Sequence, residues 1–548
     1  MPQIRNPILP GFNADPSILR VGDDYYIATS TFEWYPGVQI HHSKDLANWD
    51  LVIRPLNRKS QLDMRGNPDS CGIWAPCLTH GGEKFYLVYT DVKRKDGSFK
   101  DTHNYIVTAP KIEGPWSDPY YVNSSGFDPS LFHDDDGKKW FANMLWDHRK
   151  RPRKFAGIRL QEWDEKSGKL VGPRKTVYHG SELDLVEGPH LYKRNGYYYL
   201  LTAEGGTSYH HACTLARSKT DIWGPYEEHP DIHILTSKDH PNAAVQRAGH
   251  GDYVETPDGK WFLVHLMGRP TTQNRRCVLG RECGLQEAYW EDDWLYVKKG
   301  PVPSLYIDVP GTYDESKYWA EQRYTFDNGE LHKDFQWLRT PETDRIFALK
   351  GGKLQLYGRE SIGSWFEQAL VARRQTHFSY DAETVVDFSP EDERQFAGLT
   401  AYYCRYNFFY LTVTADAHGE REVLLMSSEN SYPEGKLNHC DTHVSIPQEG
   451  KVRLALSIRA SKLQFFYAME GDQGLRKFGA VLDASILSDE CGGHQADGSF
   501  TGAFVGMAAS DCNGEAKTAK FDYFVYRPEL SSLDRYEVTA GPRYIGAA

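Results

Sequence analysis

The sequence predicts an all-β chain, a five-bladed β-propeller followed by a β-sandwich of the concanavalin or jelly-roll kind. Three observations predict it. A turn-plus-aromatic-strand element recurs through the first part of the chain, a second element with a Trp or Tyr recurs between its copies, and the last part holds short strand-like runs with almost no helical periodicity.

The first recurring element is an acidic or amide turn followed by an aromatic-rich strand. Asp-Gly and Asn-Gly in these turns are strong tight-hairpin signals. Its five copies, about 53 to 63 residues apart, are 22–28, 82–88, 136–142, 195–201 and 258–264. Repeats of this size are typical of propeller blades, so five copies predict five blades around one axis.

The second recurring element has the character of an outer-hairpin corner with a packed Trp or Tyr. It occurs at 42–49, 109–116 and 217–226. An irregular β-sandwich whose hairpins only resemble one another is the alternative to a propeller. The recurrence of both elements in register favours the propeller.

The pattern changes near residue 301. Pro301-Val302-Pro303 and Val309-Pro310-Gly311 have the composition of a linker. We therefore expect a propeller domain over 1–310, a linker over 311–323 and a β-sandwich domain over 324–548. The strand-like runs of the second domain are 353–357, 384–388, 409–413, 452–456 and 520–526.

Composition limits the classes of partner. The formal net charge is −12, which disfavours nucleic acid and anionic membranes. The nine Cys follow no zinc or redox spacing, and we interpret them as free thiols of a reducing compartment. With no apolar signal region at the N-terminus and no apolar run of membrane-spanning length, we expect a cytoplasmic protein.

Three carboxylates lie at one offset from the hairpin turns. Asp15 precedes Asp23, Asp128 precedes Asp136 and Glu187 precedes Asn195, each by 8 residues. The innermost strand of a blade starts near the propeller axis, so the offset predicts three equivalent positions facing one pocket. Paired carboxylates in different environments are what cleavage of a glycosidic bond requires.

These motifs resemble glycoside hydrolase family 43, specifically its β-xylosidases with a C-terminal β-sandwich. The matching runs are 6–17 with its Asn-Ala-Asp-Pro, 126–130 with its Phe-Asp-Pro, and Glu187-Gly188-Pro189-His190. The resemblance implies Asp15 as general base and Glu187 as general acid. It implies that Asp128 orients the acid and raises its pKa, and that the reaction is an inverting, one-step displacement.

Further positions resemble the sugar pocket of the family. The implied substrate-binding residues are Phe32, Trp74, Phe127, Trp146, Arg281 and Phe504. Arg281 would bond the hydroxyls of the terminal sugar, and Phe504 would be inserted by the second domain. His250 resembles the axial histidine that in some members helps hold calcium or another divalent cation. A histidine bonded to Asp128 or to the sugar is the alternative, since hard cations prefer several oxygen ligands.

The resemblance implies release of xylose from the non-reducing end of β-1,4-xylo-oligosaccharides. No cofactor is required for that chemistry, and the family suggests a homo-oligomer, a dimer or a tetramer. An α-L-arabinofuranosidase or a bifunctional enzyme would use the same carboxylates. A retaining fructan hydrolase lacks support, because the motifs expected of it do not occur together. An inactive carbohydrate-binding propeller is the alternative from another class, and the intact trio argues against it.

Overall fold

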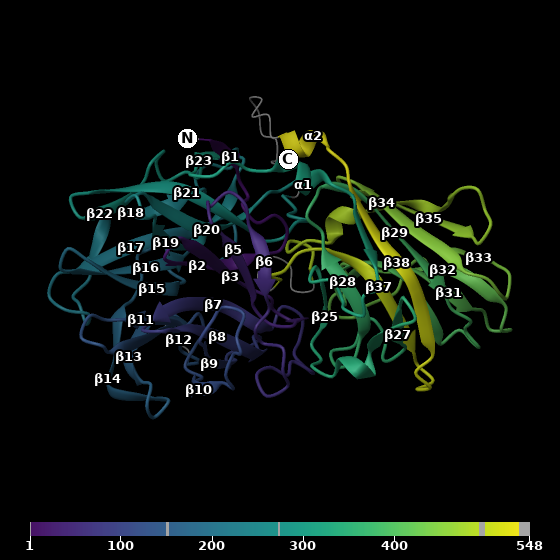
Figure 1. Cartoon of the computed structure of the whole chain (residues 1–548), viewed down its shortest axis with the longest axis horizontal. Coiled ribbons are helices and arrows are strands. Elements are labelled where there is room, and N and C mark those ends of the chain that lie inside the picture. Colours follow the sequence, from purple (N-terminus) through teal and green to yellow (C-terminus); the bar gives the residue numbers. More distant parts are fainter. Residues whose placement is uncertain (1, 150–152, 272–274, 493–498, 536–548) are drawn as a thin grey trace. The chain divides into compact units, whose positions relative to one another are not determined.

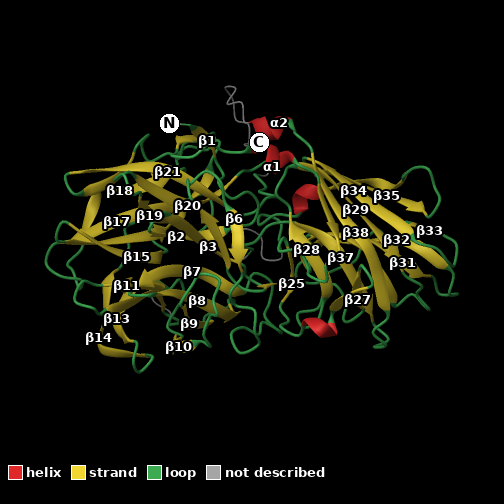
Figure 2. Ribbon diagram, viewed as in Figure 1, coloured by secondary structure: helices red, strands yellow, loops and turns green. Residues whose placement is uncertain are grey.

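The computed structural model describes residues 2–149, 153–271, 275–492 and 499–535. Strands dominate both halves of the chain, and the helices are short turns (Figures 1 and 2). The chain divides into two compact units. The first is Met1–Leu62, Cys71–Arg269 and Arg281–Tyr313; the second is Asp63–Ser70, Pro270–Gly280 and Asp314–Ala548, of which 536–548 lie outside the described residues.

The first unit is the predicted five-bladed propeller. Each blade is a four-stranded antiparallel sheet. Blade 1 consists of β2 (Ala14–Val21), β3 (Asp24–Ser30), β5 (Gln39–Ser43) and β6 (Asp50–Ile53), with β4 (Trp34–Tyr35) in the loop after β3. Blade 2 consists of β7 (Gly72–Gly81), β8 (Lys84–Arg94), β9 (Asp101–Ala109) and β10 (Tyr120–Asn123).

The other three blades follow in chain order. Blade 3 consists of β11 (Ser130–His133), β12 (Lys139–Trp146), β13 (Phe155–Asp164) and β14 (Lys169–Tyr178). Blade 4 consists of β15 (Glu187–Arg194), β16 (Tyr197–Glu204), β17 (Ala212–Ser218) and β18 (Glu227–Thr236). Blade 5 consists of β19 (Gln246–Glu255), β20 (Trp261–Gly268), β21 (Glu282–Glu291) and β22 (Trp294–Val297).

Every copy of the first sequence element forms the turn between the first and second strands of a blade. The last paired residues of the two strands on either side of these turns are Val21 with Asp24, Gly81 with Lys84, His133 with Lys139, Arg194 with Tyr197 and Glu255 with Trp261. Gly196 turns with φ of 78° and Gly259 with φ of 79°, a conformation that residues with a Cβ rarely adopt. The repeat therefore reports the number of blades correctly.

The outer corners are also confirmed. The Trp116 indole donates to the Ile112 carbonyl at 3.0 Å, and the Tyr226 hydroxyl donates to the Ile222 carbonyl at 2.9 Å. Trp49 donates in the same way to Leu46 at 3.2 Å. Each ring closes the loop between the third and fourth strands of its blade.

Two contacts close the ring of blades at the N-terminus. β1 (Gln3–Arg5) pairs antiparallel with β23 (Tyr306–Asp308). The fully buried Asn6 donates to the Leu285 carbonyl at 2.8 Å and accepts from the Leu285 N–H at 2.9 Å, which ties the start of the chain to blade 5.

Apolar side chains fill the space between neighbouring blades. Blades 5 and 1 share a cluster that includes Ile18, Ile27, Val264 and Leu285, all nearly or fully buried. Burial of one such side chain contributes about 1.5–3 kcal/mol. The blades are thus joined by packing, while backbone hydrogen bonds run within each blade.

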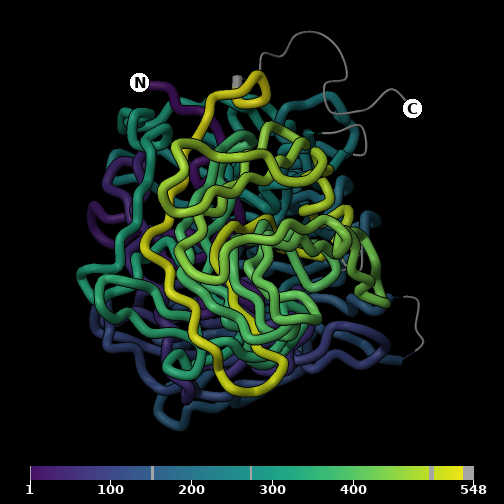
Figure 3. The backbone as a smooth tube through the Cα atoms, turned by 90° about the vertical axis from the view of Figure 1, so that its right-hand side faces the viewer, coloured from purple at the N-terminus to yellow at the C-terminus, as the bar shows by residue number. Residues whose placement is uncertain are grey.

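The second unit is a sandwich of two antiparallel sheets. One sheet has the order β26, β27, β38, β29, β34, β35, β36, with β24 also beside β38, and the other contains β33, β32, β31, β30, β37, β28 and β25 in that order. β38, near the yellow end of the colour range, runs among the green strands (Figure 3). Four of the five strand-like runs predicted for this domain fall within strands β27, β31, β34 and β38, and the run 384–388 extends one residue past the end of β29.

The bounds of these strands are as follows: β24 (Gln322–Thr325), β25 (Phe335–Leu338), β26 (Phe347–Lys350), β27 (Lys353–Tyr357), β28 (Ala369–Arg374), β29 (Ser379–Asp387), β30 (Gln395–Cys404), β31 (Asn407–Ala415), β32 (Arg421–Glu429), β33 (His443–Ser445), β34 (Val452–Arg459), β35 (Lys462–Met469), β36 (Arg476–Asp483), β37 (Phe504–Asp511) and β38 (Thr518–Pro528).

The helical segments are α1 (Glu315–Trp319), α2 (Ser532–Arg535) and the 3₁₀ turns Thr343–Arg345 and Ala484–Ile486. Within the described ranges, none of the helices has the length and apolarity needed to cross a membrane. All nine cysteines are free thiols, as expected from their irregular spacing.

Candidate active site

The inner strands β2, β7, β11, β15 and β19 neighbour one another around the propeller axis. One position near the start of each has a left-handed backbone: φ is 53° at Asp15, 35° at Ala75, 54° at Asp128, 56° at Gly188 and 44° at His250. Each lies two residues before a residue paired with the second strand of its blade, at Ser17, Cys77, Ser130, His190 and Asp252. The five positions are therefore structurally equivalent.

A bulge accompanies this conformation in four of the blades. The strand register shifts between Ala14 and Ser17 in blade 1 and between Glu187 and His190 in blade 4. Blades 2 and 5 have the same irregularity. A bulge re-aims a side chain, and left-handed non-glycine residues store strain that is common at functional sites.

The expectation of equivalent positions is correct for Asp15 and Asp128 and wrong by one residue for Glu187. In blade 4 the left-handed position is Gly188, and Glu187 directly precedes it. The reason lies in the turns, since Asp23 is the second residue of its two-residue turn whereas Asn195 is the first residue of its own, so equal offsets from these residues do not mean equal strand register.

Asp15 is a buried carboxylate with well-defined partners. Its Oδ2 accepts a hydrogen bond of 2.7 Å from the Ser30 hydroxyl, whose oxygen accepts from the Ala75 N–H at 2.8 Å. Its Oδ1 lies 3.6 Å from Nη1 of Arg281 and 3.7 Å from Nδ1 of His250. The Asp15 carboxylate is therefore held between a hydroxyl donor, a guanidinium and an imidazole.

Asp128 and Glu187 are close enough for their charges to interact. Burial, with the charges of Glu187 and then Asp15, raises the pKa of Asp128 well above its ordinary value. Burial first and the Asp15 charge second raise the pKa of Glu187 to about 8, while the charges of Arg281 and Lys100 oppose the rise. Two carboxyl groups that repel each other in this way hold a proton near neutral pH.

Hydrogen bonding distinguishes the two members of that pair. Oδ2 of Asp128 accepts from the Gly188 N–H at 3.0 Å, which favours the ionised form of Asp128. In the described part of the chain no hydrogen bond to the Glu187 carboxyl is found, so no donor favours its ionised form. We therefore place the shared proton on Glu187, where it is available for transfer to a ligand.

Four of the predicted substrate-binding aromatics form one continuous wall. The ring centroids of Phe32 and Trp74 are 5.9 Å apart, those of Trp74 and Phe127 are 5.2 Å apart, and those of Phe127 and Trp146 are 6.5 Å apart. Phe127 directly precedes Asp128, so the wall adjoins the carboxylates. Flat apolar faces beside polar groups suit a sugar ring.

Arg281 lies between this wall and Asp15. Its guanidinium lies 5.8 Å from the centroid of Phe32 as well as 3.6 Å from Asp15. The Arg281 side chain is almost fully buried, so it is not a solvated surface charge.

His250 is buried beside Asp15, and burial lowers its pKa to about 4, so the ring is neutral at pH 7. A Cβ at Gly188 would approach the His250 ring to 3.0 Å, so the ring packs closely on β15, the strand that begins with Glu187. Among the described residues, no three His, Cys, Asp or Glu side chains form a group suited to a metal ion. The donors around His250 therefore do not amount to a protein cage for a hard cation, which takes six or more oxygen ligands.

Phe504 belongs to the second unit. It begins β37, its side chain is fully buried, and the Arg374 guanidinium lies 5.2 Å from its ring centroid. Its insertion into the pocket stays a prediction.

Sequence reasoning missed Ser30 and Lys100. Ser30 ends the second strand of blade 1, and no local motif marks it as the donor to Asp15. Lys100 lies between β8 and β9 with its ammonium 4.4 Å from the Trp146 ring centroid. Burial lowers the pKa of Lys100 to about 8, and its charge acts on Glu187.

A hydrogen-bonded carboxylate, a protonated carboxyl with a raised pKa and an adjoining aromatic wall define the site of a glycoside hydrolase built on a propeller. Comparison with known proteins agrees. Residues 4–295 match Glycosyl hydrolases family 43, and residues 323–527 match the Beta xylosidase C-terminal Concanavalin A-like domain.

The similarity extends over whole chains. The chain is 76 % identical over 541 residues to Xylosidase/arabinosidase 43B of Humicola insolens, covering 98 % of this chain and 100 % of that one. It is 48 % identical to Beta-xylosidase of Bacillus subtilis, covering 96 % and 99 %. The crystal structure of xylan beta-1,4-xylosidase from Bacillus halodurans superposes with a TM-score of 0.91 at 47 % identity, covering 96 % and 100 %. The chain belongs to glycoside hydrolase family 43.

Proposed function

We propose that the chain is an exo-acting, inverting β-xylosidase that releases xylose from the non-reducing end of β-1,4-xylo-oligosaccharides. One observation carries this proposal. The Asp15 carboxylate accepts a hydrogen bond from Ser30 and lies beside the Arg281 guanidinium, while burial raises the pKa of Glu187 to about 8. An ionised base and a protonated acid are therefore available at the same pH.

In the proposed reaction Glu187 gives its proton to the glycosidic oxygen as the bond from that oxygen to the anomeric carbon breaks. Asp15 takes a proton from the water that attacks this carbon from the opposite face. The products are xylose of inverted configuration and a shortened oligosaccharide. Such enzymes hold acid and base about 6.5–9.5 Å apart, which leaves room for the water.

The aromatic wall and Arg281 would hold the terminal sugar. The wall of Phe32, Trp74, Phe127 and Trp146 supplies apolar faces, and Arg281 supplies donors for hydroxyl groups. Phe504 is proposed to close one side of the pocket. Phe504→Ala should then raise KM more than it impairs folding.

A bifunctional β-xylosidase and α-L-arabinofuranosidase is the second candidate. The Humicola insolens relative, 76 % identical, is called a xylosidase/arabinosidase. The two terminal sugars present similar hydroxyl patterns, so the same carboxylates serve both. An inactive binding propeller is disfavoured by the hydrogen bond and pKa differences within the trio.

We propose that no cofactor enters the bond-breaking steps. A cation beside His250 would take most of its ligands from water, given the donors present. Prolonged treatment with a chelator should leave the rate unchanged, and a loss restored by calcium would show that a cation is needed.

The proposed substrates are short oligosaccharides met in the cytoplasm, and the proposed assembly is a homo-oligomer. Fractionation of the source cells and sedimentation of the purified protein test these two proposals. Neither polynucleotide nor lipid vesicles should bind, given the net charge of −12.

The function is tested by initial rates on xylobiose, polymeric xylan, an aryl β-xyloside and an aryl α-L-arabinofuranoside. Xylobiose and the aryl xyloside should turn over and xylan should not. Comparable turnover of the arabinofuranoside would make the bifunctional candidate correct. Release of xylotriose or longer products from xylan would contradict exo-cleavage, and inactivity on all four would favour the binding propeller.

A further inference from the structure

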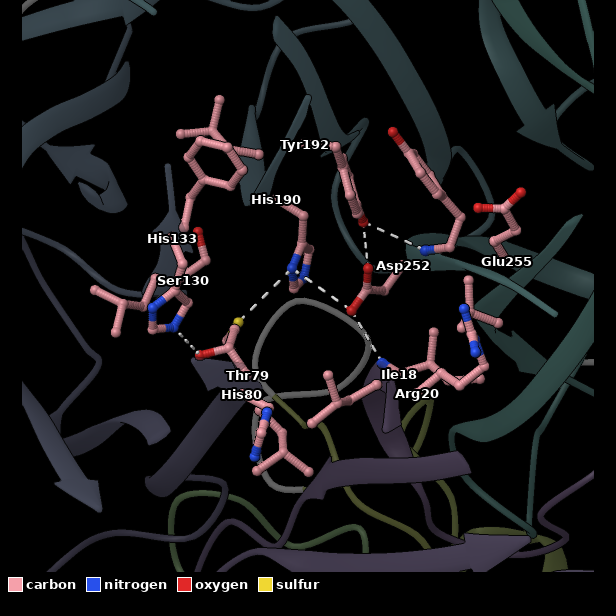
Figure 4. Close-up of a pocket in the computed structure, with 18 of the residues that line it drawn as sticks. Ile18, Arg20, Thr79, His80, Ser130, His133, His190, Tyr192, Asp252 and Glu255 are labelled. Atoms are coloured by element: carbon pink, nitrogen blue, oxygen red, sulfur yellow. Dashed lines mark hydrogen bonds and ion pairs between the residues drawn. The ribbon is translucent and has the colours of Figure 1, made fainter. Parts of the chain in front are cut away.

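Below the catalytic carboxylates, the next layer along the axis contains a buried aspartate that bonds two other blades. Asp252 lies on β19 of blade 5, two residues after His250, and is 4 % exposed. The same layer contributes Cys77, Ser130, His190 and Asp252 to the wall of a cavity of about 400 Å³ in the propeller (Figure 4).

The place of blade 5 in the ring of blades explains why Asp252 can affect both the acid and the base. The base Asp15 is on blade 1 and the acid Glu187 is on blade 4, and blade 5 lies between these two in the ring. Since backbone hydrogen bonds of the sheets run only within blades, the separation of acid and base depends on side-chain contacts through blade 5.

Asp252 bonds the blade of the base through one oxygen. Its Oδ2 accepts from the Ser17 hydroxyl at 3.0 Å and from the Ile18 N–H at 2.9 Å. Ser17 is two residues after Asp15 on β2, and its hydroxyl oxygen also accepts from the Leu78 N–H of blade 2 at 3.2 Å.

Asp252 bonds the blade of the acid through the other oxygen. Its Oδ1 accepts a hydrogen bond from the Tyr192 hydroxyl, on the same strand as Glu187 (Figure 4). The Tyr192 ring stacks on Tyr253 with centroids 3.7 Å apart, which fixes its orientation. His190 adds a further contact, with Nδ1 3.7 Å from Oδ2 of Asp252.

The chemistry of the contact requires a carboxylate. Both oxygens of Asp252 accept from donors on different blades, whereas an asparagine side chain has one oxygen acceptor. No Lys or Arg of the described residues lies within ion-pair distance of Asp252, so its negative charge is held by neutral donors and by His190. A buried carboxylate with such partners is costly unless every bond is made, so these bonds hold the strands in register.

We propose that Asp252 is a positioning residue that sets the separation of Asp15 and Glu187 across the propeller axis. The inference rests on the proposed inverting reaction, in which both groups must be correctly placed at once. A misplacement of about 1 Å in such a site costs on the order of 10²-fold in rate. Asp252 touches neither the sugar nor the attacking water and acts through the two strands.

The two sets of hydrogen bonds to Asp252 lead to different predictions. The bond from Tyr192 supports the strand of the acid, and the bonds from Ser17 and Ile18 support the strand of the base. Tyr192→Phe removes only the hydroxyl that bonds the acid's strand. It should lower kcat on xylobiose about 10-fold more than on an aryl xyloside, whose phenol leaves without a proton. Ser17→Ala loosens the base's strand and should lower kcat on both substrates equally, by about 10-fold.

Asp252→Asn leaves one oxygen acceptor for the donors of two blades and should lower kcat on both substrates, with a further loss on xylobiose. KM should change less than 2-fold in all three variants, because the sugar contacts are distant. Tyr199→Phe, on β16 of blade 4, and Ser218→Ala, whose buried hydroxyl has no partner among the described residues, are the matched controls and should retain the original kcat.

Thermal unfolding of each variant separates loss of fold from loss of position. Losses in the predicted leaving-group pattern in variants that remain folded would support the role of Asp252. Variants that match their controls, or a Tyr192→Phe loss equal on the two substrates, would overturn it. Inactivity of the unsubstituted chain on both xylosides would instead refute the proposed function.

Discussion

The Ser30 hydroxyl donates a hydrogen bond of 2.7 Å to Oδ2 of Asp15 and accepts one of 2.8 Å from the Ala75 N–H. This hydroxyl links blade 1 to blade 2 beside Asp15, the proposed general base. It fixes the orientation of the Asp15 carboxylate, so the efficiency of the proposed base depends on a residue that takes no part in bond breaking.

Ser30→Ala should lower kcat about 10-fold on xylobiose and on an aryl xyloside alike. The reason is that activation of water is common to both reactions, whereas protonation of the leaving group is not. Steady-state kinetics on the two substrates measures this, with Ser218→Ala as the control of matched chemistry. A loss confined to xylobiose would contradict the assignment of Ser30 to the base.

The raised pKa of Glu187 predicts the alkaline limit of activity. The acid is active when protonated, so kcat/KM should fall as pH rises above about 8, the pKa to which burial and the Asp15 charge raise Glu187. Asp128→Asn removes a neighbouring negative charge, so the pKa of Glu187 should fall and the alkaline limb should move to lower pH by about one unit.

The pH–rate profile of Asp128→Asn measures this shift, and Asp135→Asn at an exposed position of the same blade is the control. An alkaline limb that stays in place in Asp128→Asn would mean that Asp128, and not Glu187, carries the shared proton.

The stereochemistry of the product shows whether Asp15 activates a water molecule as a general base or attacks the sugar as a nucleophile. Proton NMR during early turnover of a β-xyloside should show α-xylose first, with β-xylose appearing only by mutarotation, because water attacks the face opposite the leaving group. Initial β-xylose, or a covalent glycosyl-enzyme, would demonstrate a retaining reaction.

Closure of the ring predicts a stability effect remote from the site. Asn6→Ala leaves the N–H and carbonyl of Leu285 without their partner in a buried position, so the free energy of unfolding should fall by about 2–4 kcal/mol. Denaturant titration measures this fall. Asn513→Ala at an exposed position should change it by less than about 0.5 kcal/mol, and an equal effect in the two variants would show that Asn6 does not close the ring.

The sequence identified the parts of the fold that local chemistry determines. Turn residues such as Asn195-Gly196 and corner rings such as Trp116 form bonds within a few residues of themselves, so their repetition revealed the blades. Asp63–Ser70 and Pro270–Gly280 belong to the second unit although they lie early in the chain, and a division of the chain into consecutive ranges has no place for them.

Within the site, the motif residues were predictable and their partners were not. Asp15 and Glu187 lie within sequence motifs of the family. Ser30 and Asp252 act through contacts between blades, and these contacts exist only once the ring of blades has closed. Asp252 follows His250 by two residues, and the family resemblance of this segment marks only the histidine. The periodicity or spacing of residues in one strand does not predict which side chains it will contact in the next blade.

The most direct test of the central claim compares Glu187→Ala and Asp15→Ala on two leaving groups. Glu187→Ala should lose about 10²–10⁴-fold on xylobiose and much less on an aryl xyloside with an acidic phenol, while Asp15→Ala should be severely impaired on both. If Glu187→Ala were equally impaired on both substrates and Asp15→Ala showed the leaving-group dependence, the acid and the base would have to be exchanged.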